Sequence, residues 1–180
     1  TIKFSNFGKV TEAEEKKPVE DDKKTDTEKN SRDESLVWSS KVSPEFCEKV
    51  IEICKNLWGE ERKIEMANGL MAVMNVETSG TFAAHQIMGR PLEKIDAITK
   101  DDFWMNKKTH KGGSRAVGLI QFTQDALEKM GEFTSGQGYE KLHTVKLNFA
   151  KMGEIKQLEK VQKYFEPMKE SIKSPEEIYL

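Results

Sequence analysis

Apolar residues recur at intervals of three and four along most of the chain beyond residue 42, and this spacing limits the possible folds more than any other feature. Such intervals place side chains on one face of an α-helix. The spacing predicts helices over residues 43–59, 61–77 and 123–131, and a longer helix further on. The apolar residues of that longer helix are Ile155, Leu158, Val161, Phe165 and Met168. Glycines and prolines interrupt residues 78–117, so the predicted class is mainly α, with at most a small β-hairpin region between residues 80 and 122.

Short local patterns indicate where helices begin and end. Ser43 followed by Pro44 is typical of a helix N-terminus, because the serine hydroxyl can accept a hydrogen bond from the first turn and proline fits there without its amide hydrogen. Gly59 then ends the first helix. The last seven residues begin with another Ser-Pro pair and place Glu177 at the capping-box position. We therefore expect a helix to start there that is either truncated or very short.

Residues 11–35 form a highly charged segment in which Ala13 and Val19 are the only apolar residues and ten acidic residues accompany six basic ones. So little apolar surface cannot offset the chain entropy lost on folding. We predict a charged tail or linker over residues 1–42, with a single exposed helix as the alternative, and one folded domain over residues 43–180. Apolar residues at the far side of the tail indicate a junction with another module, so we expect a larger parent protein.

Charge and hydropathy exclude several partners. The net charge is −2, which gives no indication of nucleic-acid binding. No apolar run approaches the roughly 18 residues that span a membrane, so no membrane insertion is expected. The first ten residues lack the apolar centre of a secretory signal. We therefore expect a cytoplasmic protein, a processed one, or one that other machinery or a parent protein exports.

The cysteines and histidines do not indicate a metal site or a cofactor. Cys47 and Cys54 are seven residues apart, roughly 10 Å along a helix axis, which exceeds the Cα separation of about 7 Å that a disulfide tolerates. We expect two core thiols. His85, His110 and His143 show no metal-ligand spacing with one another or with the cysteines.

One apolar helix face ends in a carboxyl group. Ala67, Leu70, Met74 and Glu77 share a face at helical spacing, and the helix-breaking sequence Thr-Ser-Gly follows at once. Desolvation and the negative end of the helix dipole both raise the pKa of a carboxyl in this position. A carboxylic acid that stays protonated near neutral pH can serve as a general acid. The alternative is a boundary glutamate whose side chain reaches solvent.

Three blocks of sequence resemble one family of enzymes. They are NVETSGTF at 75–82, SRAVGLIQFTQDAL at 114–127 and IKQLEKVQKYFEPM at 155–168. In this order they resemble the lysozyme-like glycosidases of the soluble lytic transglycosylase and goose-type lysozyme group, particularly the versions in phage tail proteins and modular bacterial toxins. The resemblance covers roughly residues 43–180 and implies a lysozyme-like α+β fold that is mainly α.

The resemblance implies cleavage of the β-1,4 bond between N-acetylmuramic acid and N-acetylglucosamine in peptidoglycan, with Glu77 as the general acid. Hydrolases of inverting type need a second carboxylate, for which Asp96, Asp101 and Asp102 are candidates. Each of them can equally be a solvated loop charge. Transglycosylases of the group use one acid and let a substrate hydroxyl attack, so hydrolysis and transglycosylation both stay open.

The resemblance also implies substrate-binding positions at Thr78, Ser114, Gly118, Gln121 and Tyr164. A glycine at 118 lets the backbone approach a sugar. The amide of Gln121 can bond an acetamido group or, alternatively, the local backbone. The hydroxyl of Tyr164 can reach the catalytic carboxyl, unless Tyr164 is a core aromatic.

The interval between the first two blocks is longer than in the family, and its 31 residues, 85–115, resemble an insertion. This insertion can supply a cleft wall. Trp104 and Phe103 can stack on sugar rings. The basic side chains of the insertion can bind lactyl or peptide carboxylates. These side chains are Lys107, Lys108, Lys111 and Arg115. The alternative is that the aromatics belong to the core and the lysines to a solvated loop.

The leading hypothesis is a muramidase that acts at the cell wall, as one module of a phage tail protein or a secreted antibacterial toxin. Its partners would be glycan strands and, for a toxin, an inhibitory immunity protein. A catalytically silent lysozyme-like module that binds glycan or protein is the second hypothesis, and a purely structural helical domain is the third. An acid on an apolar face favours the enzyme, because a silent module does not need one.

Overall fold

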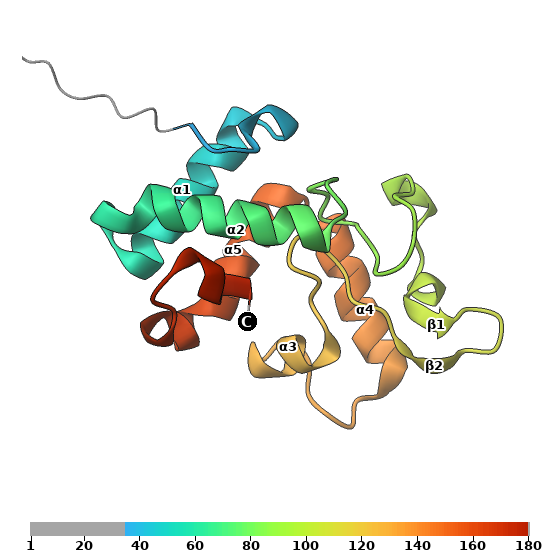
Figure 1. The fold of residues 1–180 in the computed structure, drawn as a ribbon. Coiled ribbons are helices and arrows are strands. Elements are labelled where there is room, and N and C mark those ends of the chain that lie inside the picture. The colour runs from blue at the N-terminus through green and yellow to red at the C-terminus, as the bar shows by residue number, and fades with distance from the viewer. Residues whose placement is uncertain (1–34, 180) are drawn as a thin grey trace, which may run out of the picture. The chain divides into compact units, whose positions relative to one another are not determined.

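The structure, a computed structural model, describes residues 35–179. The prediction of a charged tail falls mostly on residues 1–34, which lie outside this range. The five α-helices of the described range are α1 (Pro44–Trp58), α2 (Lys63–Glu77), α3 (Gln124–Lys129), α4 (Gly138–Lys151) and α5 (Glu154–Phe165). A two-stranded antiparallel sheet joins β1 (Trp104–Asn106) to β2 (Lys111–Ser114). The predicted class, mainly α with a small hairpin, is therefore confirmed (Figure 1).

Short 3₁₀ turns fill much of the remaining chain. They are η1 (Ser39–Lys41), η2 (Glu60–Arg62), η3 (Ile95–Ala97), η4 (Lys100–Phe103), η5 (Glu166–Ser171) and η6 (Pro175–Tyr179). Within residues 35–179, none of the helices combines the length and the apolar character that a membrane crossing requires.

Helix α1 begins and ends as its sequence predicts. The Ser43 hydroxyl accepts a hydrogen bond from the backbone N–H of Phe46 at 3.1 Å, and Gly59 ends the helix with a φ of +93°. The apolar face of α1 packs against α2 and α5. Cys54 is fully buried in this face and Cys47 is partly buried beside it, as expected of two core thiols.

Helix α2 is the central helix of the core. Ala67, Leu70 and Met74 of the predicted apolar face are fully buried. Met66 and Met71, which lie off that face, are fully buried too, because α2 packs against α1 on one side and η6 on another. Glu77 is the last residue of α2 and is half-buried, so the helix carries an ionisable group to the edge of the core.

A glycine in the middle of α2 allows the C-terminal segment to dock. A Cβ atom at Gly69 would lie 2.7 Å from Cβ and 2.9 Å from Cα of Pro175, distances that close-packed atoms do not reach. Ile178 of the same segment is buried against this face. The helix predicted at the end of the chain is thus the 3₁₀ turn η6, held against α2.

The irregular region between Glu77 and α3 contains the hairpin. Trp104 pairs with Ser114 and Asn106 with Lys111. The sequence VGLIQF forms a tight turn closed by a bridge between Val117 and Phe122, and a second bridge joins Val117 to Ile87. The Thr123 hydroxyl caps α3 by accepting a hydrogen bond from the Ala126 N–H at 3.1 Å, as predicted.

The sequence reading needs three corrections. The core reaches back to Leu36, which is only 3% exposed, so the predicted domain start at residue 43 is too late. The predicted long helix ends at Phe165 rather than continuing through Met168, because Pro167 has no amide hydrogen to continue it. Helix α4 was not predicted, although its buried residues Leu142, Val145 and Phe149 have helical spacing.

Replacing Gly69 with alanine tests the docking of η6. Alanine favours helix formation by about 1 kcal/mol over glycine. The clash with the Pro175 backbone should outweigh that gain, since overpacking costs about 1–3 kcal/mol. We expect Gly69→Ala to lower the free energy of unfolding by about 1–2 kcal/mol, measured by urea denaturation. An increase in stability would show that η6 does not depend on this contact.

Candidate functional site

The Glu77 carboxyl group lies at the end of α2 without a protein partner. Within residues 35–179, no hydrogen bond or ion pair reaches it. Burial raises the pKa of Glu77 above its ordinary value. The prediction that the core-facing position raises this pKa is therefore supported, and the carboxyl is available to a ligand.

Two hollows meet at Glu77. The first has a volume of about 370 Å³ and the second of about 620 Å³. Glu77, Ile120 and Tyr179 line both of them. A chain-like ligand that occupied both hollows would pass over the carboxyl, so a reacting bond can lie beside Glu77 with a binding region on each side.

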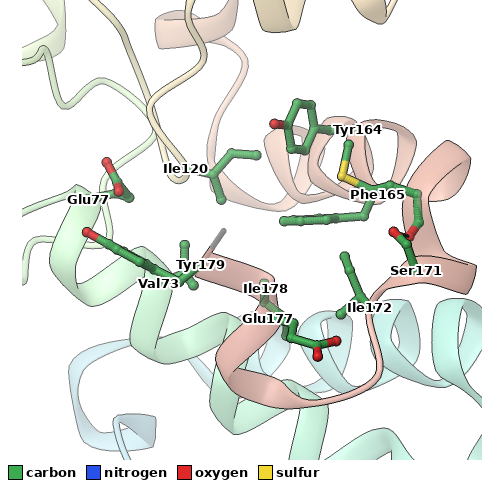
Figure 2. A pocket seen from close by; sticks show the side chains of 11 residues that line it. Val73, Glu77, Ile120, Tyr164, Phe165, Ser171, Ile172, Glu177, Ile178 and Tyr179 are labelled. Atoms are coloured by element: carbon green, nitrogen blue, oxygen red, sulfur yellow. Dashed lines mark hydrogen bonds between the residues drawn. The ribbon is translucent and has the colours of Figure 1, made fainter.

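The first hollow has polar and apolar walls in nearly equal measure, and Figure 2 shows its side chains surrounding a common space. Its apolar lining is formed by Val73, Ile120, Phe165, Met168, Ile172 and Ile178. Tyr164 lies on one side and Glu77 at the edge (Figure 2). Aromatic and aliphatic walls of this kind suit the apolar faces of sugar rings or other flat groups.

The second hollow has more polar side chains along its wall. They are Ser79, Gln86, Arg90, Gln121 and Thr123, and the exposed Val76 and Met88 lie at its rim. Both sides of Glu77 therefore offer polar and apolar contacts to a ligand.

The sequence reading missed Tyr179. This residue is 57% exposed, lines both hollows, and in Figure 2 extends from η6 toward Glu77. Its neighbour Ile178 is buried against α2, so the docking of η6 fixes the position of Tyr179. The Ser-Pro helix start at 174–175 was a signal for an ordered C-terminal segment, but its docking site on α2 depends on tertiary packing.

Tyr164 is at the site but does not reach the acid. It lines the first hollow with Glu77, and its ring packs edge-on against Phe122 and Phe165, with ring centroids 6.4 and 5.1 Å away. Its hydroxyl forms no hydrogen bond with Glu77. The predicted contact between the two side chains is therefore absent from the described structure, and the core-aromatic alternative describes Tyr164 better.

Gly118 is required for a reason other than the predicted one. Its φ is +91°, and a Cβ there would lie 2.3 Å from Oε1 of Gln157. Gly118 is buried and lines neither hollow, so its small size accommodates the Gln157 amide rather than a sugar. This corrects its assignment as a substrate-binding residue.

The fully buried Gln157 side chain joins the segments around the site. Its Oε1 accepts a hydrogen bond from the Leu119 N–H at 2.7 Å. Its Nε2 donates to the carbonyl oxygens of Ala84 at 2.9 Å and Phe149 at 2.8 Å. One side chain of α5 thereby fixes the VGLIQF turn, the loop after α2 and the end of α4.

Gln121 lines the second hollow, and both hydrogens of its side-chain amide already form hydrogen bonds. Nε2 donates to the carbonyl oxygens of Gln86 at 3.1 Å and Gly118 at 2.9 Å, which is the backbone pairing considered as the alternative. Its own φ is +55°, so these bonds hold a backbone conformation that is unfavourable for a glutamine. A sugar hydroxyl or amide could meet only the oxygen of this side chain.

Thr78 is a structural residue. Its hydroxyl donates to the Met74 carbonyl at 2.6 Å and accepts from the Phe82 N–H at 2.9 Å, and the side chain is fully buried. It lines neither hollow. The assignment of Thr78 to substrate binding is therefore wrong; the residue ends α2 directly after the acid.

The three aspartates predicted as candidates for a second catalytic carboxylate lie outside the two hollows. Asp102 is 1% exposed and pairs with Arg90 at 2.9 Å and Lys107 at 2.6 Å. Burial opposes its ionisation, but hydrogen bonds from Lys107 and Thr99 prevail and lower its pKa. Asp101 lies 3.5 Å from His110 on the surface, and Asp96 is exposed in η3. None of the three lines a hollow beside Glu77.

Glu177 is the other carboxylate of the first hollow. Its Oε2 accepts a hydrogen bond from the Lys173 N–H at 2.5 Å. Figure 2 shows this carboxylate directed away from Glu77. It binds the N–H of Lys173, one residue before the Ser174 predicted as the N-cap, and is not a partner of Glu77.

Trp104 and Ser114 belong to a separate cluster on α4 and the hairpin. The Trp104 ring stacks on His110 with centroids 5.4 Å apart and contacts Tyr139 and His143 at 4.7 Å each. The Ser114 hydroxyl lies 2.8 Å from Nζ of Lys146 and 3.0 Å from Nε2 of His143. Neither Trp104 nor Ser114 lines a hollow beside Glu77, which corrects their assignment to that site.

Two basic groups of this cluster are buried. Lys146 is 0% exposed and binds the Ser114 hydroxyl and the Arg115 carbonyl oxygen, at 2.8 Å each. Burial lowers its pKa to about 8. Burial and the nearby Lys146 charge lower the pKa of His143 to about 4. His143 is therefore neutral at pH 7, and its Nε2 can accept the Ser114 proton.

Comparisons with protein-family models, curated proteins and solved structures gave no significant match. In residues 35–179, no group of three or more histidine, cysteine, aspartate or glutamate side chains is arranged to hold a metal ion.

The lowered pKa of His143 predicts a pH dependence of stability. Between about pH 6.5, the ordinary value, and about pH 4, the unfolded chain binds a proton at His143 that the folded protein resists. The wild type should therefore lose stability across this window as the pH falls. His143→Phe should lose less, and chemical denaturation at pH 7, 5.5 and 4 measures the difference. An equal loss of the free energy of unfolding in both proteins as the pH falls would contradict a lowered pKa at His143.

Proposed function

We propose that this chain is a peptidoglycan-cleaving muramidase that acts on the β-1,4 bond between N-acetylmuramic acid and N-acetylglucosamine, with Glu77 as the general acid. The observation that carries the proposal is the unpaired, partly desolvated Glu77 carboxyl at the junction of two hollows. The resemblance of the three sequence blocks to lysozyme-like glycosidases supplies the substrate class and the lysozyme-like assignment of the fold.

The site supports acid catalysis through the protonation state of Glu77. A raised pKa keeps a larger fraction of the carboxyl protonated near neutral pH, so that it can donate to the bridging oxygen as the glycosidic bond breaks. The two hollows would hold the sugars on either side of that bond. Holding both sides is what aligns the oxygen with the proton donor.

The placement of the other carboxylates favours transglycosylation over hydrolysis. Asp102 is paired with Arg90 and Lys107, Asp101 lies beside His110, and Glu177 accepts a hydrogen bond from the Lys173 N–H. After the glycosidic bond breaks, a hydroxyl of the same muramic acid can attack the oxocarbenium-like centre. Its proton returns to the Glu77 carboxylate, and a 1,6-anhydro end is formed. An internal nucleophile needs no second carboxylate, because its attack is already intramolecular.

The same proposal places the protein's action at the cell wall, with glycan strands as its partner and no cofactor. A role as a module of a phage tail protein or a secreted antibacterial toxin fits this substrate. In a toxin, an inhibitory immunity protein would be a further partner.

Glu77→Gln tests the catalytic role. Glutamine has nearly the same shape but no acidic proton, so peptidoglycan cleavage should fall by a factor on the order of 10²–10⁴. Turbidity loss of purified peptidoglycan and release of soluble fragments measure the rate. Glu159→Gln, at an exposed position of α5, is the matched control and should keep wild-type activity.

The same variant should gain stability at neutral pH. A raised carboxyl pKa means that ionising Glu77 costs the folded state free energy once the pH exceeds the ordinary value of about 4.3. Glutamine removes that cost at pH 7 but changes little at pH 3. An inactive variant that is also unstable at pH 7 would point to a structural rather than a catalytic role.

The products distinguish the two reaction types. We expect 1,6-anhydro muramic acid ends, identified by mass spectrometry of the digest. Asp96→Ala and Asp101→Ala should keep full activity, because both side chains are exposed and away from the hollows. Asp102→Ala should lower stability through loss of the Arg90 and Lys107 pairs. Reducing muramic acid ends, with activity lost in one exposed variant, would instead assign that aspartate as the base of a hydrolase.

A further inference from the structure

The β-hairpin concentrates positive charge in a protein whose net charge is −2. Residues 104–115 include three lysines and one arginine but no carboxylate. Two of these cations are used within the fold. Lys107 pairs with Asp102, and the Arg115 guanidinium donates to the carbonyl oxygens of Met88, Trp104 and Met105.

Lys108 and Lys111 remain available. Both are exposed, and neither side chain has a hydrogen bond or ion pair within residues 35–179. The buried Lys146 binds Ser114 of β2 and a backbone carbonyl but no carboxylate of the described chain. The side chains of Lys108 and Lys111 therefore carry positive charge that no described carboxylate pairs with, and His110, between them in the chain, lies 3.5 Å from Asp101.

An aromatic cluster includes His110, which directly precedes Lys111 in the chain. The stacked pair of Trp104 and His110 continues into Tyr139, which is 42% exposed. Together with Lys108 and Lys111, these residues define a surface that we call the hairpin platform. Aromatic rings next to lysines suit a ligand that carries both apolar groups and carboxylates.

Arg115 links the hairpin to the wall of the second hollow. It donates hydrogen bonds to the Trp104 carbonyl of β1 at 3.1 Å and to the Met88 carbonyl at 2.8 Å. Met88, Gly89 and Arg90 line the hollow that contains Glu77. Figure 1 shows the hairpin at one edge of the domain, next to α4. A substituent leaving a sugar in the second hollow can thus extend toward the platform.

We propose that the hairpin platform binds the carboxylates of peptidoglycan stem peptides, so that the domain favours glycan that still carries its peptides. This inference rests on the proposed muramidase function, because that function defines which ligand occupies the second hollow. Stem peptides combine several carboxylates with short apolar side chains, which matches the lysines and the rings of the platform.

The test compares two soluble ligands that differ only in their peptides. The first is glycan strands with uncross-linked stem peptides, freed of phosphodiester polymers. The second is the same strands after an amidase has removed the peptides. Binding is measured by calorimetry with the Glu77→Gln protein, which does not consume the ligand, and cleavage is measured separately with Glu77 intact.

The decisive variant is Lys108→Gln with Lys111→Gln. Exposed ion pairs contribute modestly, so affinity for the peptide-bearing strands should fall about three- to tenfold, and less at high salt. Affinity for the peptide-free strands should not change. The matched control is Lys151→Gln with Lys156→Gln, two equally exposed lysines without partners in the described chain, and it should bind both ligands normally.

Several outcomes would overturn the inference. They are an unchanged affinity for peptide-bearing strands, an equal loss on both ligands, or no binding of either ligand by the Glu77→Gln protein. The proposed function is judged separately, by whether the protein with Glu77 intact cleaves peptide-free strands. Cleavage without peptide discrimination would retain the muramidase and reject the platform, whereas peptide-dependent binding without cleavage would reject the catalytic role of Glu77 and not the platform.

Discussion

The arrangement around Glu77 depends on one buried amide. The Gln157 side chain donates to or accepts from the backbone of three segments, at Ala84, Leu119 and Phe149. Leaving these buried backbone groups unpaired would cost about 1–3 kcal/mol each, so the position of the VGLIQF turn over α5 is strongly determined. Gly118 completes the arrangement, because any side chain there would occupy the space of the amide. Ile120, at the boundary between the two hollows, takes its place from this turn.

The polar residues near Glu77 form hydrogen bonds with the backbone and none with the Glu77 carboxyl. Thr78 binds a carbonyl oxygen at the end of α2, Gln121 binds carbonyl oxygens around its own turn, and Glu177 binds the Lys173 N–H. Each of these groups is occupied by the backbone, and none is directed to the Glu77 carboxyl. That carboxyl consequently experiences desolvation without a compensating partner, which is the condition that keeps a carboxylic acid protonated.

The buried charged groups around the hairpin differ from Glu77, because they have hydrogen-bonding partners. Asp102 is buried with Arg90 and Lys107, which fixes the loop before β1. Lys146 and His143 of α4 are buried, bind the Ser114 hydroxyl of β2 and have lowered pKa values. The hairpin is therefore anchored by the ion pairs of Asp102 and by hydrogen bonds to the basic groups of α4. Met88 lines the second hollow together with Glu77, and its carbonyl oxygen accepts a hydrogen bond from Arg115 at the end of the hairpin.

The sequence by itself determined the helical class, the caps at Ser43 and Thr123, and the apolar face that ends in Glu77, because each depends on residues within a few positions of one another. The family resemblance also indicated that Gly118 had to be small, but for another reason, approach to a sugar, than the one the structure shows, which is space for the Gln157 amide. Tertiary structure alone decided that Thr78, Ser114 and Trp104 lie outside the hollows, that Asp102 is an ion-pair partner, and that Tyr179 stands beside Glu77. These outcomes depend on contacts between residues far apart in the chain, such as Gly69 with Pro175 and Gly118 with Gln157. Local periodicity shows which face of a helix or strand is buried, but only the packed structure specifies which residues that face contacts.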